Sequence, residues 1–230
     1  MKITCALWLA FMTMVQAAGL DFAASLQEIH APADVKTVTV DFEFTNRSDQ
    51  PVTVAKYEPT CTCISVRIQE GKLRYEPGES GMIRAEFNMG NLTGTVDKVV
   101  AVWINDDPAD KPSVALTVRV HIPVLVSLSP KTLKWDLNGK GEPKTIRISM
   151  HYEQPIRVVG VTASSDVYQH ELKVVEEGKS YDLIITPTQI QTPGLGIFRI
   201  ETDCKIEKHR IQQVFACVRK ASPSEPVLPP

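Results

Sequence analysis

The sequence predicts an all-β protein made of two antiparallel β-sandwiches in tandem. Three observations support this fold class. Apolar and polar residues alternate with a period of two through most of the chain, which is the pattern of half-buried strands. Turn residues recur between these short runs, as they do between the strands of a sandwich. The second half of the chain repeats the order of strands and turns of the first half, which indicates a duplicated unit.

Residues 1–17 have the pattern of a signal peptide. Lys2 supplies a basic start, an apolar run follows to Val15, and Val15-Gln16-Ala17 matches the small-x-small cleavage pattern. The apolar run is shorter than the roughly 20 residues that a spanning helix needs, although an uncleaved anchor is the alternative. We therefore expect leader cleavage, no transmembrane segment in the mature protein, and an extracytoplasmic location, either periplasmic or secreted.

The first sandwich is predicted over residues 18–122. Turn chemistry separates its strands, as in Asn46–Pro51 and Pro77-Gly78. Between such turns, the alternating runs contain β-branched and aromatic residues that favour extended backbone. The expected strands are Val38–Asn46, Val52–Val54, Ile64–Ile68, Met82–Asn88, Val99–Ile104 and Val114–Val120.

The second sandwich is predicted over residues 123–219, since Pro123 ends the pairing of the preceding strand. The Pro-rich tail 220–230 is predicted to be disordered. Three stretches align between the two halves in the same order, with offsets that shrink as loops shorten. They pair Phe42–Val54 with Ile146–Val158, Gly78–Ser80 with Gly178–Ser180, and Val100–Ile104 with Phe198–Thr202.

Composition and motifs exclude several classes of function. The formal net charge is −2 and the basic residues are scattered, which argues against a nucleic-acid binder. The histidines are dispersed, and no nucleophile elbow or phosphate-binding glycine loop occurs. Trp103 and Trp135 lie in strand-like settings and are expected in the core, so no aromatic platform for a carbohydrate is evident. We therefore predict no enzyme and no cofactor.

Four cysteines remain once Cys5 leaves with the leader: Cys61, Cys63, Cys204 and Cys217. An even number in an oxidising compartment is compatible with disulfides, and three pairings are possible. If residues 205–208 form a hairpin turn, Cys217 lies roughly 26 Å along the ladder from Cys204. Both are then expected to be packing residues or exposed thiols, with a bridge from Cys204 to the first sandwich as the alternative.

Cys61 and Cys63 form a Cys-x-Cys pair that aligns with Ser165 and Val167 in the second half. The fold therefore does not require these thiols. In an extended strand their Cα atoms would lie roughly 6.6 Å apart, near the upper limit for a disulfide. A bridge between them would need a local kink and would be easily reduced.

The Cys-x-Cys pair leaves four interpretations open. It could be a structural disulfide or a pair of inert thiols, or it could be a redox-active pair. It could also bind copper(I), with Met82, Met89 or His30 as further ligands, or it could link to a cysteine elsewhere. Zinc is not expected, because no second ligand pair has the required spacing.

The motifs of the first half resemble a known family. The strand Phe42-x-Phe44-Thr45-Asn46, the pair Cys61-x-Cys63 and the turn Pro77–Gly81 occur in the order seen in the bacterial domain of unknown function 1573. The resemblance covers Leu20 to Ile122 and implies an exported, immunoglobulin-like domain. The chain departs from the family at Thr62, where the family usually has glycine, and a β-branched residue disfavours positive φ.

Together these observations predict two tandem immunoglobulin-like antiparallel β-sandwich domains after a signal peptide. The expected function is that of an exported, non-enzymatic structural or interaction module, with protein partners in the cell envelope. Strand edges and the cysteine loop are the expected contact surfaces. The alternative function is a thiol redox or copper(I)-handling protein centred on Cys61 and Cys63.

Overall fold

The computed structural model describes residues 19–220, and these divide into two compact units. The first unit comprises residues 19–30, Lys36–Met89 and Thr95–His121. The second comprises Ala31–Val35, Gly90–Gly94 and the chain from Ile122 onward. The predicted leader and the tail from residue 221 lie outside the described residues. Within them, no helix is long and apolar enough to cross a membrane.

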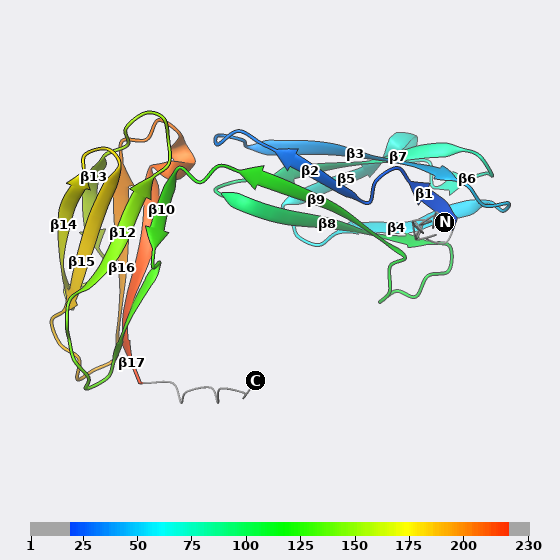
Figure 1. The fold of residues 1–230 in the computed structure, drawn as a ribbon. Coiled ribbons are helices and arrows are strands. Elements are labelled where there is room, and N and C mark those ends of the chain that lie inside the picture. The colour runs from blue at the N-terminus through cyan, green and yellow to red at the C-terminus, as the bar shows by residue number, and fades with distance from the viewer. Residues whose placement is uncertain (1–18, 221–230) are drawn as a thin grey trace, which may run out of the picture. The chain divides into compact units, whose positions relative to one another are not determined.

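The first unit is a sandwich of two sheets (Figure 1). One sheet has the strand order β1-β3-β7-β5 and the other has β2-β9-β8-β4-β6. A short 3₁₀ turn, η1 (Gln69–Gly71), follows β5. The strands are β1 (Leu20–Phe22), β2 (Leu26–His30), β3 (Thr37–Asn46), β4 (Val52–Pro59), β5 (Ile64–Ile68), β6 (Arg74–Tyr75), β7 (Ser80–Asn88), β8 (Gly94–Ile104) and β9 (Val114–Ile122).

The second unit repeats this arrangement with sheets β10-β12-β15-β14 and β11-β17-β16-β13. A second 3₁₀ turn, η2 (Glu207–His209), precedes its last strand. The predicted all-β fold of two tandem immunoglobulin-like sandwiches is confirmed. The strands are β10 (Val126–Ser129), β11 (Thr132–Asp136), β12 (Lys144–Met150), β13 (Val158–Ala163), β14 (Tyr168–Glu176), β15 (Ser180–Pro187), β16 (Gly194–Thr202) and β17 (Ile211–Arg219).

Each unit also contains one parallel strand pair, which the sequence did not indicate. In the first unit β2 runs parallel to β9, and in the second β11 runs parallel to β17. In both units the N-terminal stretch is split, so that its first strand joins one sheet and its next strand joins the other. Alternation shows which side chains are buried, but it does not show which neighbour a strand pairs with.

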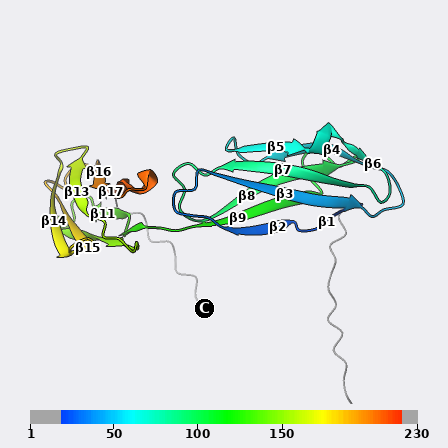
Figure 2. The same cartoon turned by 90° about the horizontal axis from the view of Figure 1, so that it is seen from above.

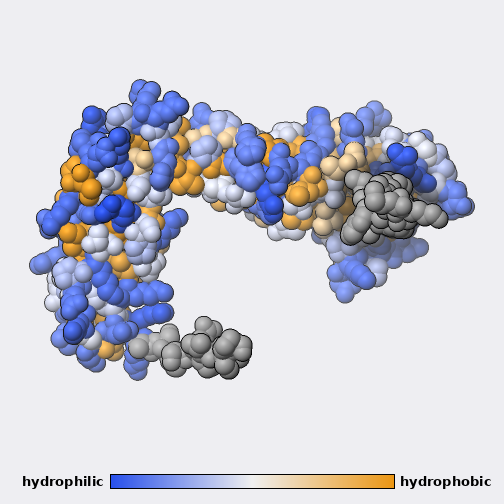
Figure 3. All heavy atoms as spheres, viewed as in Figure 1, coloured by the Kyte–Doolittle hydropathy of each residue, from blue (hydrophilic) through white to orange (hydrophobic). Residues whose placement is uncertain are grey.

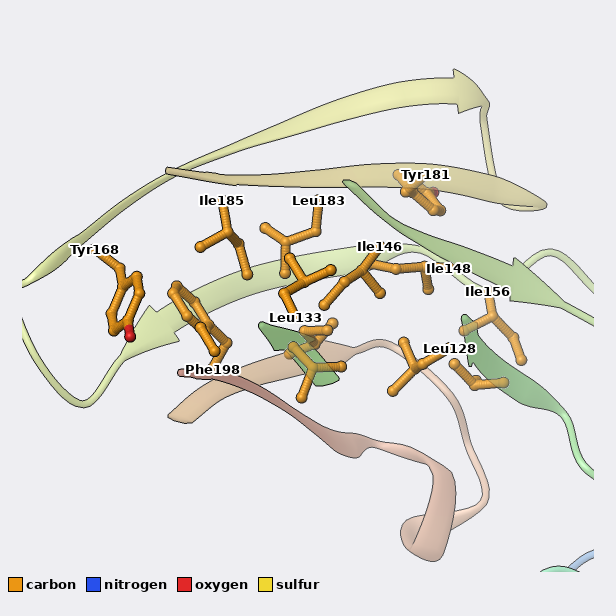
Figure 4. Close-up of a cluster of buried hydrophobic side chains, with 14 of the residues drawn as sticks. Leu128, Leu133, Ile146, Ile148, Ile156, Tyr168, Tyr181, Leu183, Ile185 and Phe198 are labelled. Atoms are coloured by element: carbon orange, nitrogen blue, oxygen red, sulfur yellow. The ribbon is translucent and has the colours of Figure 1, made fainter. Parts of the chain in front are cut away.

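The core of each unit lies between its two sheets. In the first unit, every second residue of β3 from Val38 to Asn46 is buried, and Ile83, Ala85 and Phe87 of β7 are completely so. In the second unit, the core includes Ile146, Leu183 and Phe198 (Figure 4). Trp103 and Trp135 are buried as predicted.

Asn46 is a buried polar residue at the end of β3, and its side chain organises the turn that follows. Its Nδ2 donates to the carbonyl oxygens of Gln50 (2.8 Å) and Tyr75 (2.9 Å). Its Oδ1 accepts from the Ser48 amide (3.0 Å) and hydroxyl (2.7 Å). Because every polar atom of the amide has a partner, its burial costs little.

An aromatic ring packs against a glycine in each unit. A Cβ on Gly81 would lie 2.5 Å from Tyr75 and 2.6 Å from Phe44. A Cβ on Gly196 would lie 2.6 Å from the Tyr168 ring. Both glycines are strand residues that face the core, so the tyrosine ring occupies the space of the missing side chain.

Substitution of Gly81 by alanine should therefore destabilise the first unit by about 1–3 kcal/mol, because the new methyl group overlaps two aromatic rings. Urea unfolding measures this change. Gly160→Ala is the matched strand control, since a Cβ there meets only the tip of Glu201 at 4.0 Å. Equal stability of the two variants would contradict this packing.

His209 is a buried histidine in the second unit, and its burial makes the stability of that unit depend on pH. Its side chain is 1% exposed, and its Nε2 has no hydrogen-bond partner among residues 19–220. Burial, and secondarily the charge of Lys208, hold the pKa of His209 below its ordinary value of 6.5. The neutral form is therefore favoured in the folded state.

Acidification should weaken the second unit through His209. Above pH 6.5 the ring is neutral in both states, whereas below it the unfolded chain binds a proton that the folded chain resists. Thermal unfolding between about pH 7.5 and about pH 5.5 should show a steeper loss in the wild type than in His209→Gln. Parallel pH profiles would exclude this role for His209.

Candidate functional site at the cysteine loop

The Cys-x-Cys pair lies where the chain crosses from one sheet of the first unit to the other. β4 ends at Pro59 in one sheet, and β5 begins at Ile64 in the other. The amide and hydroxyl of Thr60 both donate to the Val99 carbonyl on β8, at 3.1 and 3.0 Å. The Cys63 carbonyl accepts from the Asn88 amide at 2.9 Å. The loop is thus held at both ends, once by each sheet.

Within this loop Cys61 and Cys63 are joined by a disulfide. Their Cα atoms lie 5.3 Å apart, closer than in an extended strand. The chain turns here, and the Ile64 amide donates to the Cys61 carbonyl at 3.4 Å. Thr62 is not among the described residues with positive φ. The loop therefore reaches the required kink with a β-branched residue at position 62.

The ammonium group of Lys98 lies against the disulfide. Its Nζ lies 3.2 Å from Sγ of Cys63 and 3.9 Å from Sγ of Cys61. The β4–β8 register pairs Pro59 with Val100, so continuing it two residues places Lys98 opposite Cys61. Both sulfur-bearing residues and Lys98 are half-buried, whereas Thr62 is exposed. The site is therefore a disulfide at the surface with an ammonium group against it.

The second unit has the same crossover without this chemistry. Its Ser164 amide donates to the Ile197 carbonyl at 2.9 Å, as Thr60 does to Val99. Its Val167 carbonyl accepts from Thr188 at 2.9 Å, as Cys63 does from Asn88. The Ser165 hydroxyl accepts from the Val167 amide at 3.3 Å, where the first unit has the disulfide. The backbone clamps are thus common to both units, and the disulfide and the lysine are additions to one.

The residues proposed as further copper ligands lie at other places in the first unit. His30 on β2 is exposed and stacks on His121 at 4.6 Å. Met89 is completely buried. Met82 lines a surface pocket of about 500 Å³ with Glu43, on the outer face of β3 and β7. With the sulfurs bonded to each other, neither is a thiolate ligand. Among the described residues there is no group of three or more His, Cys, Asp or Glu side chains placed to hold a metal ion.

Cys204 and Cys217 are free thiols. Cys204 is buried in the core of the second unit and follows β16. Cys217 is half-buried on β17, opposite Leu195 of β16. The two are therefore not a hairpin pair.

Sequence reasoning found the two cysteines but missed Lys98. The lysine lies 35 residues after Cys63 on a strand of alternating pattern, where a charged residue ordinarily faces solvent. The signal that could have found it is the register of β4 with β8. The pattern of apolar and polar residues does not predict that register, because it does not show that β4 and β8 are neighbours.

The first unit matches the model of a protein family. Residues 20–120 match the family model described as Protein of unknown function (DUF1573). The predicted resemblance of the first unit to this family is confirmed. No curated protein matches the chain.

Three solved structures illustrate the folds to which this chain is similar. A protein of unknown function from Porphyromonas gingivalis W83 is 12% identical, covers 88% of this chain and 100% of its own, and has a TM-score of 0.35. The YadV chaperone is 7% identical, with coverages of 86% and 99% and a TM-score of 0.32. An ASH / PapD-like domain of human CEP192 is 10% identical, with coverages of 53% and 97% and a TM-score of 0.34.

Removal of the disulfide should leave the first unit folded. A double Cys61→Ser, Cys63→Ser variant should lose only about 1–2 kcal/mol of unfolding free energy, because a bridge between residues two apart closes a very short loop. The clamps at Thr60 and Cys63 involve the backbone and persist. Urea unfolding with circular dichroism tests this expectation, and loss of the β-sheet spectrum in native buffer would overturn it.

Proposed function

We propose that this protein is an exported, non-enzymatic immunoglobulin-like module that binds a protein partner of the cell envelope at the corner formed by β5 and the cysteine loop. The match to DUF1573 and the all-β fold are compatible with a non-enzymatic module. The observation that carries the proposal is the open edge of β5, which begins directly after the disulfide.

β5 is an edge strand with an uninterrupted register. Among the described strands it pairs only with β7, from Ile64 opposite Phe87 to Ile68 opposite Ile83 (Figure 2). The Asn88 amide bonds to the Cys63 carbonyl. Since backbone groups alternate between the two sides of an antiparallel strand, the N–H and C=O of Val66 point away from β7. An extended segment can add to this edge by backbone hydrogen bonds.

Other antiparallel edge strands carry features that hinder strand addition. β14 has a bulge between Val174 and Glu176, and β13 has one between Val158 and Gly160. β1, β6 and β10 are shorter than β5, with three, two and four residues. Bulges and short lengths are the usual protections of an exposed edge. β5, with five residues and no bulge, has neither.

The side chains of β5 that border this edge are mostly polar and accessible. Ser65 and Arg67 of β5 are exposed, and Val66 is half-buried. Figure 3 shows the opposite face of the first unit, on the side of β2 and β9, where hydrophilic residues predominate and apolar residues lie in scattered patches. Affinity would then come from the backbone ladder, and specificity from the side chains beside it.

Site-specific photo-cross-linking in the native host tests the proposal. A benzophenone side chain at Ser65 or Arg67 should yield a discrete cross-linked protein, because both positions flank the open edge. Thr162 on β13 and Gln213 on β17 are control positions in the second unit and should give none. Equal products from all four positions, or none from β5, would contradict the assignment. Turnover of a substrate by the purified protein would contradict the non-enzymatic function.

A further inference from the structure

We propose that Cys61, Cys63 and Lys98 form a thiol–disulfide exchange site that reacts with the cysteine thiolate of another protein. Exchange requires an accessible disulfide and a sulfur that leaves readily as a thiolate. The loop supplies the first, since it lies at the surface between two sheets with Thr62 exposed. Lys98 supplies the second.

The lysine charge favours one of the two sulfurs as the leaving group. Lys98 Nζ is 3.2 Å from Cys63 Sγ and 3.9 Å from Cys61 Sγ. A cation beside a sulfur stabilises the thiolate, so the better leaving group is Cys63. The incoming thiolate therefore attacks Cys61 Sγ.

The reaction is balanced without a further reagent. The partner thiolate forms a bond to Cys61 Sγ, the Cys61–Cys63 bond breaks, and its electron pair remains on Cys63 Sγ beside the Lys98 ammonium. The product is a mixed disulfide between Cys61 and the partner. A second thiolate of the partner then attacks the partner sulfur that is bonded to Cys61, and Cys61 leaves as a thiolate. The partner dithiol is thereby oxidised to a disulfide, and Cys61 and Cys63 are left reduced.

The ammonium group of Lys98 forms no ion pair with a carboxylate among the described residues. Its neighbour Asp97 is held by Arg119, with both carboxylate oxygens accepting at 2.8 Å. In a strand, successive side chains point to opposite faces, so the Asp97 carboxylate and the Lys98 ammonium lie on opposite faces of β8. The half-buried ammonium is directed at the sulfurs.

The second unit shows that this arrangement is separable from the fold. Aligning Val100 with Phe198 places Gly196 at the position of Lys98. There the glycine accommodates the Tyr168 ring, 2.6 Å from where its Cβ would stand. Serine and valine replace the cysteines, and the same backbone clamps hold the crossover. The first unit therefore combines three reactive residues at a position where the fold requires none of them.

Glutathione serves as the probe thiol, because exchange with a small thiol needs no docked partner and so is independent of the proposed function. The full-length mature protein is mixed with excess glutathione near neutral pH and quenched at intervals with an alkylating agent. Peptide mass spectrometry then follows the Cys61–Cys63 bond and the glutathione adduct. In the wild type, the adduct should form on Cys61 in preference to Cys63.

The Lys98→Gln variant should react about tenfold more slowly, because the leaving thiolate loses its neighbouring charge. Lys98→Arg keeps the charge and should restore most of the rate. Lys56→Gln is the matched control: it removes a lysine of the adjacent strand β4 that is paired with Glu58 at 2.9 Å, and its rate should equal that of the wild type. Circular dichroism of each variant verifies the fold.

Single cysteine variants provide a readout that a purely structural lysine would not affect. In Cys61→Ser, the Cys63 thiol should alkylate at lower pH than the Cys61 thiol of Cys63→Ser, and adding Lys98→Gln should abolish the difference. Equal rates for wild type and Lys98→Gln, or alkylation profiles insensitive to Lys98, would overturn the proposal. Preferential glutathione addition to Cys63 would overturn the assigned direction of attack.

Discussion

The apolar seam between two sheets is the constraint on which each unit depends. Phe42, Ile83 and Phe87 are completely buried in the first unit, and they stand at alternate positions of neighbouring strands. A shift of one residue in the pairing would turn the apolar side chains of the shifted strand toward solvent. Burial of a large apolar side chain contributes about 1.5–3 kcal/mol, so the pairing of β3 with β7 is strongly specified. The loops between the strands are correspondingly free to vary.

The crossover loop between the sheets is an example of such variation. In both units the chain leaves one sheet and enters the other through a short loop clamped by the same pair of backbone hydrogen bonds. Because these clamps use backbone atoms, the residues at the two cysteine positions can differ between the units. The second unit has serine and valine there, and the first has a disulfide with Lys98 beside it. The same crossover thus occurs with the disulfide in one unit and without it in the other.

The position of the disulfide also connects the two proposals. β5 starts one residue after Cys63, so a segment added along β5 would end near the reactive sulfurs. Strand addition orients a partner chain along a known direction, and a cysteine of that partner could then meet Cys61. The edge of β5 would bind the partner by strand addition, and the disulfide would then react with a cysteine of the bound partner.

By itself, the sequence determined the fold class, the buried residues and the duplicated order of strands. It could do so because a period of two in apolar residues directly encodes which face of a strand is buried. The strands Ile64–Ile68 and Val114–Val120, the buried Trp103 and Trp135, and the turns at Gly78 and Gly178 with positive φ all follow from local patterns.

Only the tertiary structure decided the pairing partners and the composition of the site. Nothing local distinguishes the parallel pairs β2–β9 and β11–β17 from antiparallel ones, since alternation is the same in both. Lys98 resembles any solvent-facing strand lysine until β4 is placed beside β8. A contact between residues far apart along the chain depends on register and on the crossover, and these are properties of the assembled sheets and not of either segment alone.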